Sequence, residues 1–279
     1  MVKTRGKRKH YLPICTAVLV AAVAGFLFLI RPPEKPVPPA PVPVPKEGGK
    51  PPEEKIEEYH IAVIIDDVGY PSARINGYLE FDGKLTFSVL PALERSGEYA
   101  RLLHDRGFEV MIHIPMEPIS YPETDPGPMA ILTGDVRSEI ENKLGIMAAE
   151  NPHAAGANNH MGSKATQDRR LMRYTLDSLK ARGLFFVDSV TTSGSHGYEV
   201  ARELSVPTAR RDVFLDNEDS FAYINGQFER LKALAKQHGT AVGIGHITKS
   251  HTLAVLNHQL PGLEKENIKL IFASEAVSY

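Results

Sequence analysis

Carboxylates and imidazoles recur where short apolar runs of this 279-residue chain end. In parallel α/β proteins the carboxyl ends of the strands meet at one edge of the sheet, and reactive side chains gather there. Oxygen and nitrogen ligands of these types suit a zinc-like ion and leave one position open for water. The pattern therefore indicates a metal-dependent hydrolase. The polar residues in question are Asp66, Asp67, His113, Glu117, Asn159, His160, Asp188, Asp216 and His246.

Each of the earlier candidates also has an ordinary structural explanation. The pair Asp66 and Asp67 could form a turn or cap, because aspartate side chains bond local amides. The apolar run before the pair and Gly69 after it favour two carboxylates in one cleft. Two close carboxylates would raise one pKa, which suits a base beside a metal ligand. His113, at a strand end before Pro115, is interpreted as a ligand rather than a core histidine.

The later candidates are weaker when taken singly. His160 follows two asparagines in a segment between two glycines. This segment could form a turn, or His160 could be a metal ligand. His246 follows a glycine. Taken alone, it is equally well interpreted as a site residue or as a histidine without a role in the site. Asp188 and Asp216 fit caps, or supports for the ligands, better than direct participants.

The elements that must position these residues alternate between strand-like and helix-like segments. Short apolar runs occupy residues 60–65, 85–90, 109–114, 184–187, 241–244 and 268–272, and a short strand is expected before residues 156–163. Helix-like segments occupy residues 94–106, 136–150, 168–182, 221–238 and 252–260. Such alternation predicts an α/β domain with a mostly parallel sheet, barrel-like or doubly wound. The length of this region fits one domain, expected to span residues 57–279.

Taken together, five blocks of sequence resemble the divergent polysaccharide deacetylase family, a branch of the NodB-homology carbohydrate esterases. The blocks are IIDDVG (64–69), HIPMEP (113–118), GANNHMGS (156–163), FFVDS (185–189) and GIGH (243–246). They occur in family order from about residue 60 onward. The resemblance implies a distorted (β/α) barrel of about seven strands with a divalent-metal site, which we expect to hold zinc.

The resemblance also implies roles for individual residues. In the wider superfamily the first aspartate of the pair is the base and the second a metal ligand, which here are Asp66 and Asp67. His113 matches the first histidine of a His-x-x-x-His block, and His246 resembles the late histidine that acts as an acid.

Two departures from the superfamily affect the site. Glu117 stands where the second histidine of the block belongs, so either His160 or Glu117 could be the third ligand. The Arg-x-Pro-Tyr block of ordinary deacetylases is not evident in the sequence. The metal site therefore resembles the family more closely than the substrate groove does.

The amino-terminal region predicts that the folded domain is located outside the cytoplasm. Five basic residues precede an apolar run at residues 14–30, which as a helix is roughly 25 Å long and nearly spans a bilayer. The basic flank predicts a cytoplasmic amino terminus and an exported remainder. Because no small-residue cleavage site follows, we expect residues 1–31 to be an uncleaved inner-membrane anchor. The alternative is a signal peptide whose removal releases the protein.

The segment that follows, residues 32–56, predicts an extended linker. Ten of residues 32–55 are proline, a density that favours polyproline II conformation and a passive spacer. At about 3.1 Å per residue it would reach roughly 70 Å from the membrane. Peptidoglycan is therefore a reasonable candidate substrate.

Composition excludes several classes of function. Without the six basic residues of segment 1–31, the chain has 26 basic against 34 acidic residues, a net charge of about −8. This balance argues against nucleic acid or anionic lipid as the main partner. The single cysteine, Cys15, lies in the apolar run, so the exported domain has no disulfide, zinc–thiolate site or cysteine nucleophile.

The function expected from the sequence is removal of N-acetyl groups from a polysaccharide outside the cytoplasm. In this hypothesis Asp67, His113 and His160 hold the metal, Asp66 accepts a proton from water, and His246 protonates the leaving amine. Two alternatives remain: a glycan-binding protein on a deacetylase fold, and another metal hydrolase such as a phosphodiesterase. The oligomeric state is left open by the sequence.

Overall fold

The computed structural model describes residues 58–279, which belong to one compact unit spanning Lys55–Tyr279. The predicted anchor (1–31) and proline-rich linker (32–56) lie outside the described residues and stay predictions. Among the residues described, no helix combines the length and the apolar character needed to cross a membrane.

A single sheet of nine parallel strands forms the centre of the described domain. The strands are β1 (Tyr59–Val68), β2 (Thr86–Val89), β3 (Glu109–Met116), β4 (Ala154–Met161), β5 (Phe185–Asp188), β6 (Thr208–Arg210), β7 (Val213–Phe214), β8 (Thr240–His246) and β9 (Ile268–Ile271). Their order is β6-β5-β4-β3-β2-β1-β8-β7, and β9 pairs with the first half of β1. The predicted parallel α/β class is confirmed.

The sheet departs from the expected barrel in two respects. It curls into a half-barrel, and within residues 58–279 no ladder joins the two end strands, β6 and β7. It also has nine strands, whereas the resemblance implies about seven. Two of the nine, β6 and β7, contain only three and two residues. Strands this short leave no apolar run in the sequence. Residues 154–161, expected as a short strand and a turn, form the full strand β4.

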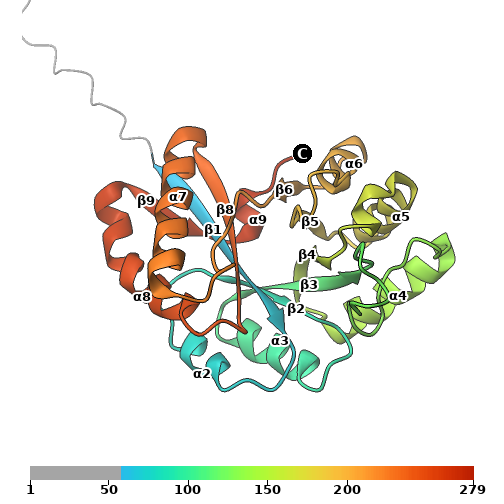
Figure 1. Cartoon of the computed structure of the whole chain (residues 1–279), viewed down its shortest axis with the longest axis horizontal. Coiled ribbons are helices and arrows are strands. Elements are labelled where there is room, and N and C mark those ends of the chain that lie inside the picture. The colour runs from blue at the N-terminus through green and yellow to red at the C-terminus, as the bar shows by residue number, and fades with distance from the viewer. Residues whose placement is uncertain (1–57) are drawn as a thin grey trace, which may run out of the picture. The chain divides into compact units, whose positions relative to one another are not determined.

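Helices cover the outer side of the curl (Figure 1). They are α2 (Arg74–Leu79), α3 (Ser96–Asp105), α4 (Arg137–Glu150), α5 (Arg169–Lys180), α6 (Gly197–Glu203), α7 (Phe221–His238) and α8 (Thr252–Leu263), with short 3-10 turns η2 (Ala165–Gln167) and η3 (Glu264–Glu266). The five predicted helices are confirmed to within a few residues at their ends. Helices α2 and α6, which have six and seven residues, were not predicted.

The alternation of side chains along the strands creates two cores. In β1, Ile61 and Val63 pack outward against the helices, whereas Ala62 and Ile64 face the interior of the curl. Since successive side chains of a strand point to opposite faces, the next interior position after Ile64 is Asp66. The same step leads from Met111 to His113 in β3 and from Ile244 to His246 in β8. The pattern that builds the inner core therefore also aims the polar residues.

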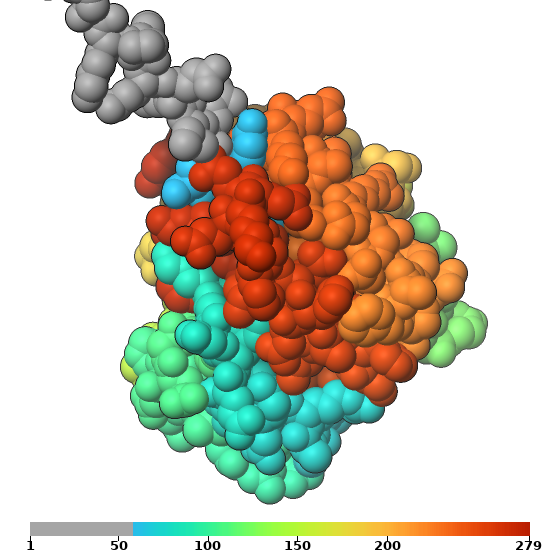
Figure 2. All heavy atoms as spheres, turned by 90° about the vertical axis from the view of Figure 1, so that its left-hand side faces the viewer, coloured from blue at the N-terminus to red at the C-terminus, as the bar shows by residue number. Residues whose placement is uncertain are grey.

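The carboxyl-terminal segment closes the opposite end of the curl. The amide of Ala273, at the start of helix α9 (Ala273–Ala276), donates to Thr86 Oγ1 at 2.9 Å, at the beginning of β2. Ser278 exchanges two backbone hydrogen bonds with Thr208, at the beginning of β6. Figure 2 shows residues from the late part of the chain, in red, beside the first described residues, in blue. The carboxyl-terminal segment thus joins the beginnings of β2 and β6.

Candidate metal centre

Asp66 and Asp67 face the same cleft because β1 contains a bulge between Ile65 and Val68. Three residue steps of β1 there oppose two of β2, and Asp67 adopts a left-handed backbone with φ of +65°. In a regular strand the two carboxylates would point to opposite faces, whereas a bulge re-aims one of them. Aspartate is one of the few residues that tolerate this conformation.

The ligand atoms of Asp67, His113 and His160 converge at the ends of β1, β3 and β4. Oδ1 of Asp67 lies 3.1 Å from Nδ1 of His160 and 3.4 Å from Nε2 of His113. The two ring nitrogens lie 3.1 Å apart. In the described part of the chain these three residues form the one group with the spacing of metal ligands.

Asn158 sets the orientation of His113. Its Oδ1 accepts hydrogen bonds from His113 Nδ1 at 2.7 Å and from Ser88 Oγ at 2.5 Å, and its Nδ2 donates to Asp66 Oδ1 at 2.9 Å. With its proton on Nδ1, the imidazole presents the Nε2 lone pair to Asp67 and His160. Metal-binding histidines are held in this way by a partner on the other ring nitrogen.

The residues present fit a divalent metal ion. Asp67 Oδ1 is buried and accepts no hydrogen bond from the protein, although it faces two imidazoles. Burial alone would raise the pKa of Asp67, but the adjacent His113 and His160 side chains hold it well below its usual range. An ionised carboxylate oxygen and two ring nitrogens that converge on one point are a typical set of zinc ligands.

Asp66 is placed beside the cluster rather than within it. Its carboxylate is buried, and Oδ2 lies 3.6 Å from Nε2 of His113. Burial raises the pKa of Asp66 above its usual range, although His113 and His246 act in the opposite direction. A carboxylate with a raised pKa can accept a proton more readily than an exposed one.

His246 lies on β8, next to Asp66 in the parallel register of β1 and β8. Its Nδ1 donates to Oδ1 of the fully buried Asp216 at 2.7 Å, which leaves Nε2 for the cleft. Thr252 Oγ1 and the His246 amide donate to the other oxygen of Asp216 at 2.7 and 2.6 Å. Burial alone would lower the pKa of His246, but Asp216 raises it to about 9. The imidazole is therefore cationic at neutral pH.

Gly245 makes this close approach of Asp216 sterically allowed. A Cβ at Gly245 would lie 2.8 Å from Thr252 Cγ2 and 3.1 Å from Asp216 Oδ2. Contacts this short would displace the carboxylate that holds His246.

Glu117 is directed away from the cluster. Oε1 pairs with Lys164 Nζ at 2.6 Å, and Oε2 accepts from the amide and hydroxyl of Thr133 at 2.6 and 2.7 Å. These contacts connect the end of β3 to the loops on either side. The geometry thus brings His160, and not Glu117, to Asp67 and His113.

Asp188 and Asn159 shape the ends of β5 and β4. The carboxylate of Asp188 accepts from Ser195 Oγ at 2.7 Å and from the Tyr198 amide at 3.0 Å, near the start of α6. Asn159 Nδ2 donates to the carbonyl of Met161 at 2.8 Å. Both side chains are occupied by local structure, as the capping interpretation of Asp188 expected.

Two residues that matter to the cleft were not singled out from the sequence. Asn158 lies two residues before His160 and therefore on the same face of β4, which is a signal that strand periodicity contains. Ser189 lines the cleft beside Asp66 and His113. No pattern in the sequence marks this serine as different from the other polar residues at strand ends.

The cluster lies in a cleft of about 200 Å³, whose walls also include His246, Phe214 and Thr191. A second hollow of about 170 Å³ adjoins it and shares Asp67 and His160. The lining of this second hollow includes Tyr70, Leu90, Leu93, Pro126 and Pro128.

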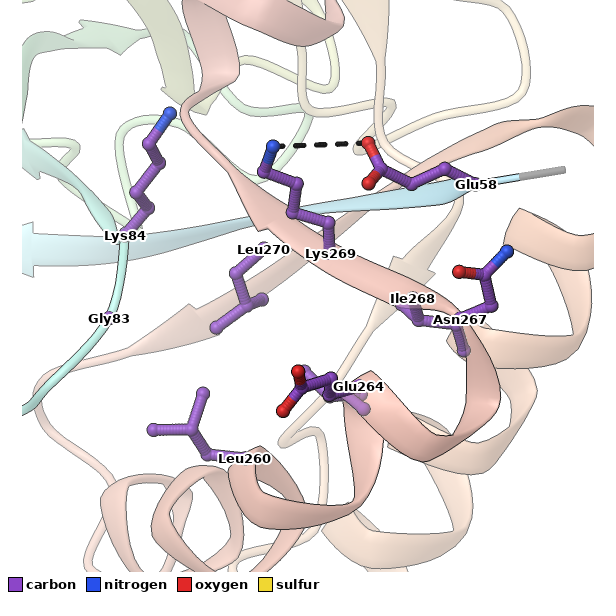
Figure 3. A pocket seen from close by; sticks show the side chains of 10 residues that line it. Glu58, Gly83, Lys84, Leu260, Glu264, Asn267, Ile268, Lys269 and Leu270 are labelled. Atoms are coloured by element: carbon purple, nitrogen blue, oxygen red, sulfur yellow. Dashed lines mark ion pairs between the residues drawn. The ribbon is translucent and has the colours of Figure 1, made fainter. Parts of the chain in front are cut away.

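A larger groove, of about 440 Å³, lies at the other end of β1, along β9 (Figure 3). Leucines form much of its lining, and at its rim Lys269 Nζ lies 3.9 Å from a carboxylate oxygen of Glu58. No histidine lines this groove. Its residues offer no combination of ligand, base and acid, so the smaller cleft is the candidate site.

An open, curled parallel sheet with an Asp-His-His cluster at its carboxyl edge belongs to the polysaccharide deacetylase class. The chain belongs to the divergent polysaccharide deacetylase family, whose family model matches residues 63–277. The resemblance inferred from the five sequence blocks is thereby confirmed.

Relatives of this chain occur in several bacteria. It is 34% identical over 219 residues to the uncharacterised protein YibQ of Escherichia coli K12, which covers 78% of this chain and 67% of YibQ. It is 32% identical over 211 residues to an uncharacterised Haemophilus influenzae protein, which covers 76% and 74% of the two chains. The uncharacterised protein ATU2773 of Agrobacterium tumefaciens C58 has a similar structure, with a TM-score of 0.76 at 22% identity over 81% of this chain and 92% of that one. That structural match supports the fold.

Proposed function

We propose that this protein is a metal-dependent hydrolase that removes N-acetyl groups from a polysaccharide outside the cytoplasm. One observation carries the proposal: Asp67, His113 and His160 converge beside a buried carboxylate, Asp66, in a cleft that a cationic His246 also lines. Membership of the polysaccharide deacetylase family supports the substrate class. Peptidoglycan is the candidate polysaccharide.

Zinc is the metal that we propose for the cluster, because two imidazoles and one carboxylate are its usual ligands. When bound, such an ion polarises an amide carbonyl and lowers the pKa of a bound water to about 7. The protein's part is to hold Asp67 ionised and to present both ring nitrogens without protons. The hydrogen bond from His113 Nδ1 to Asn158 performs the second task for His113.

Asp66 and His246 move the protons in this proposal. Asp66, buried and with a raised pKa, accepts a proton from the attacking water. His246 donates a proton from Nε2 to the leaving nitrogen, since an unprotonated amine anion is a poor leaving group. Both groups are needed for an amide. They lie side by side on β1 and β8, so both can reach one bond.

Metal content and acetate release test the proposal directly. Purified full-length protein should contain about one zinc per chain and release acetate from peptidoglycan or chitin-type oligosaccharides. Chelation should abolish release, and added zinc should restore it. Glycan binding without acetate release would leave a binding protein instead. Cleavage of phosphodiesters by a two-metal form would indicate a phosphodiesterase.

The extracytoplasmic location rests on the basic flank and the apolar run of residues 14–30. We propose that this segment anchors the domain to the inner membrane, with residues 57–279 on the outer side. A reporter fused after Lys55 should be active only outside the cytoplasm. Cytoplasmic activity of the fusion would contradict this part of the proposal.

A further inference from the structure

Ser189, the first residue after β5, has a buried hydroxyl that no protein group satisfies. The residue is 1% exposed, and its Oγ has no hydrogen-bond partner among the described residues. It lines the same cleft as Asp66, His113 and His246. A buried polar atom left without a partner is destabilising, so such groups are rare and call for an explanation.

The backbone of Ser189 is fixed on both sides. Its amide donates to Asn159 Oδ1 at 2.9 Å, and its carbonyl accepts from Arg211 Nε at 2.7 Å. The Arg211 guanidinium also donates to the carbonyl of Val190 at 2.9 Å and lies 3.6 Å from the ring centroid of Phe214, which lines the cleft. With its backbone held, Ser189 keeps its Cβ in place, and rotation about a single bond alone directs the hydroxyl.

The neighbouring hydroxyl of the cleft is already engaged. Thr191 Oγ1 donates to the carbonyl of Met161 at 2.8 Å. Ser189 is therefore the hydroxyl that this wall offers to a bound molecule. A serine hydroxyl both donates and accepts, and so does each hydroxyl of a sugar.

We propose that Ser189 Oγ binds a hydroxyl of the glycan in the cleft and so positions the sugar against Asp66 and the metal cluster. Only the identity of the ligand as a glycan rests on the proposed function. Ser189 acts in binding and not in proton transfer, because its hydroxyl forms no hydrogen bond with His113 or His246. A contact made equally in the ground state and the transition state affects KM and Kd, and leaves kcat nearly unchanged.

Thr175 offers a matched control. It lies in α5, is fully buried, and its Oγ1 is also without a hydrogen-bond partner, but it does not line the cleft. Ser189→Ala and Thr175→Val each remove one unsatisfied hydroxyl. Removing such a group is neutral or stabilising for the fold, so neither variant should lower the melting temperature.

The experiment measures binding of an N-acetylglucosamine tetramer to the full-length protein by calorimetry, with melting temperature and, where turnover occurs, KM and kcat. Ser189→Ala should weaken Kd or raise KM about tenfold, the effect of one hydrogen bond, with kcat within about twofold. Thr175→Val should leave all three unchanged.

Unchanged tetramer binding in Ser189→Ala, together with a lower melting temperature, would show that the hydroxyl is structural and would overturn the inference. Wild-type protein that binds the tetramer but releases no acetate would end the deacetylase proposal, while Kd would still decide the role of Ser189. Wild-type protein that does not bind the tetramer at all would overturn both.

Discussion

Two parts of the cleft differ in whether their polar groups find partners within the protein. In the metal-side cluster (Asp67, His113 and His160), a carboxylate oxygen and two ring nitrogens converge, and Asp67 Oδ1 has no hydrogen-bond partner in the described part of the chain. In the His246–Asp216 pair, the charge of the imidazole and both carboxylate oxygens are matched within the protein. The first arrangement is complete only with a cation bound, whereas the second is complete as it stands. Removal of metal should therefore affect the two parts very differently.

The largest effect is expected from Asp67→Asn. The neutral amide is a poor replacement for a carboxylate ligand, so both metal and activity should be lost. Asparagine also tolerates the left-handed backbone of this position, so the fold should be kept. Metal content by mass spectrometry and the melting temperature check both points. His113→Ala and His160→Ala should behave alike, and a panel in which every variant keeps its metal would refute the cluster as a metal site.

Asp66→Asn should separate catalysis from metal binding. The metal should stay, because Asp66 is beside the cluster and not part of it, while kcat should fall by about 10²–10⁴, the usual loss for a general base. The comparison needs metal stoichiometry and acetate release from the same preparation. Loss of metal in this variant would make Asp66 a ligand and reverse the assignment of the two carboxylates.

The His246–Asp216 pair should determine how the rate depends on pH. Asp216 raises the pKa of His246 to about 9, so the protonated acid is present at neutral pH and is lost as the pH rises through 9. Asp216→Asn removes the largest cause of the increase and should move the alkaline fall in kcat to lower pH, towards the ordinary histidine value of about 6.5. His246→Ala should abolish this fall and leave metal content unchanged. An alkaline limb that stays in place in Asp216→Asn would exclude His246 as the acid.

Glu117→Gln should have the smallest effect. Its contacts are with Lys164 and Thr133, so metal and kcat should be retained, with a loss of stability of about 1 kcal/mol from weakened hydrogen bonds. Thermal unfolding and metal content are the measurements. Should Glu117→Gln lose metal while His160→Ala retains it, Glu117 would be the third ligand.

The sequence predicted the longer elements well because their signal is local. Apolar runs and helical periodicity depend on neighbouring residues, and they located six of the nine strands and five long helices. The very short strands β6 and β7 escaped detection, since two or three residues show no period.

The site was predictable in its residue types and less so in its contacts. Asp67, His113 and His160 come together as expected, and His160 rather than Glu117 reaches the cluster. Asn158 was missed because its role depends on pairing across strands, between atoms 45 residues apart along the chain. The bulge in β1 was likewise not predicted, because no simple sequence pattern marks it. Gly69 indicated only that a turn follows the two aspartates.

The position of β1 has a consequence for how the chain is made. His60 pairs with Thr240 and Lys269, roughly 180 to 210 residues later in the sequence. At about 5–20 residues per second, synthesis of that stretch takes roughly 10–40 s. During this time β1 can pair only with β2. The other hydrogen-bonding edge of its apolar run, residues 61–65, stays unpaired and is therefore prone to aggregation. Contacts of such long range also slow folding itself. A chain that stops before residue 240 should therefore aggregate instead of forming half a domain.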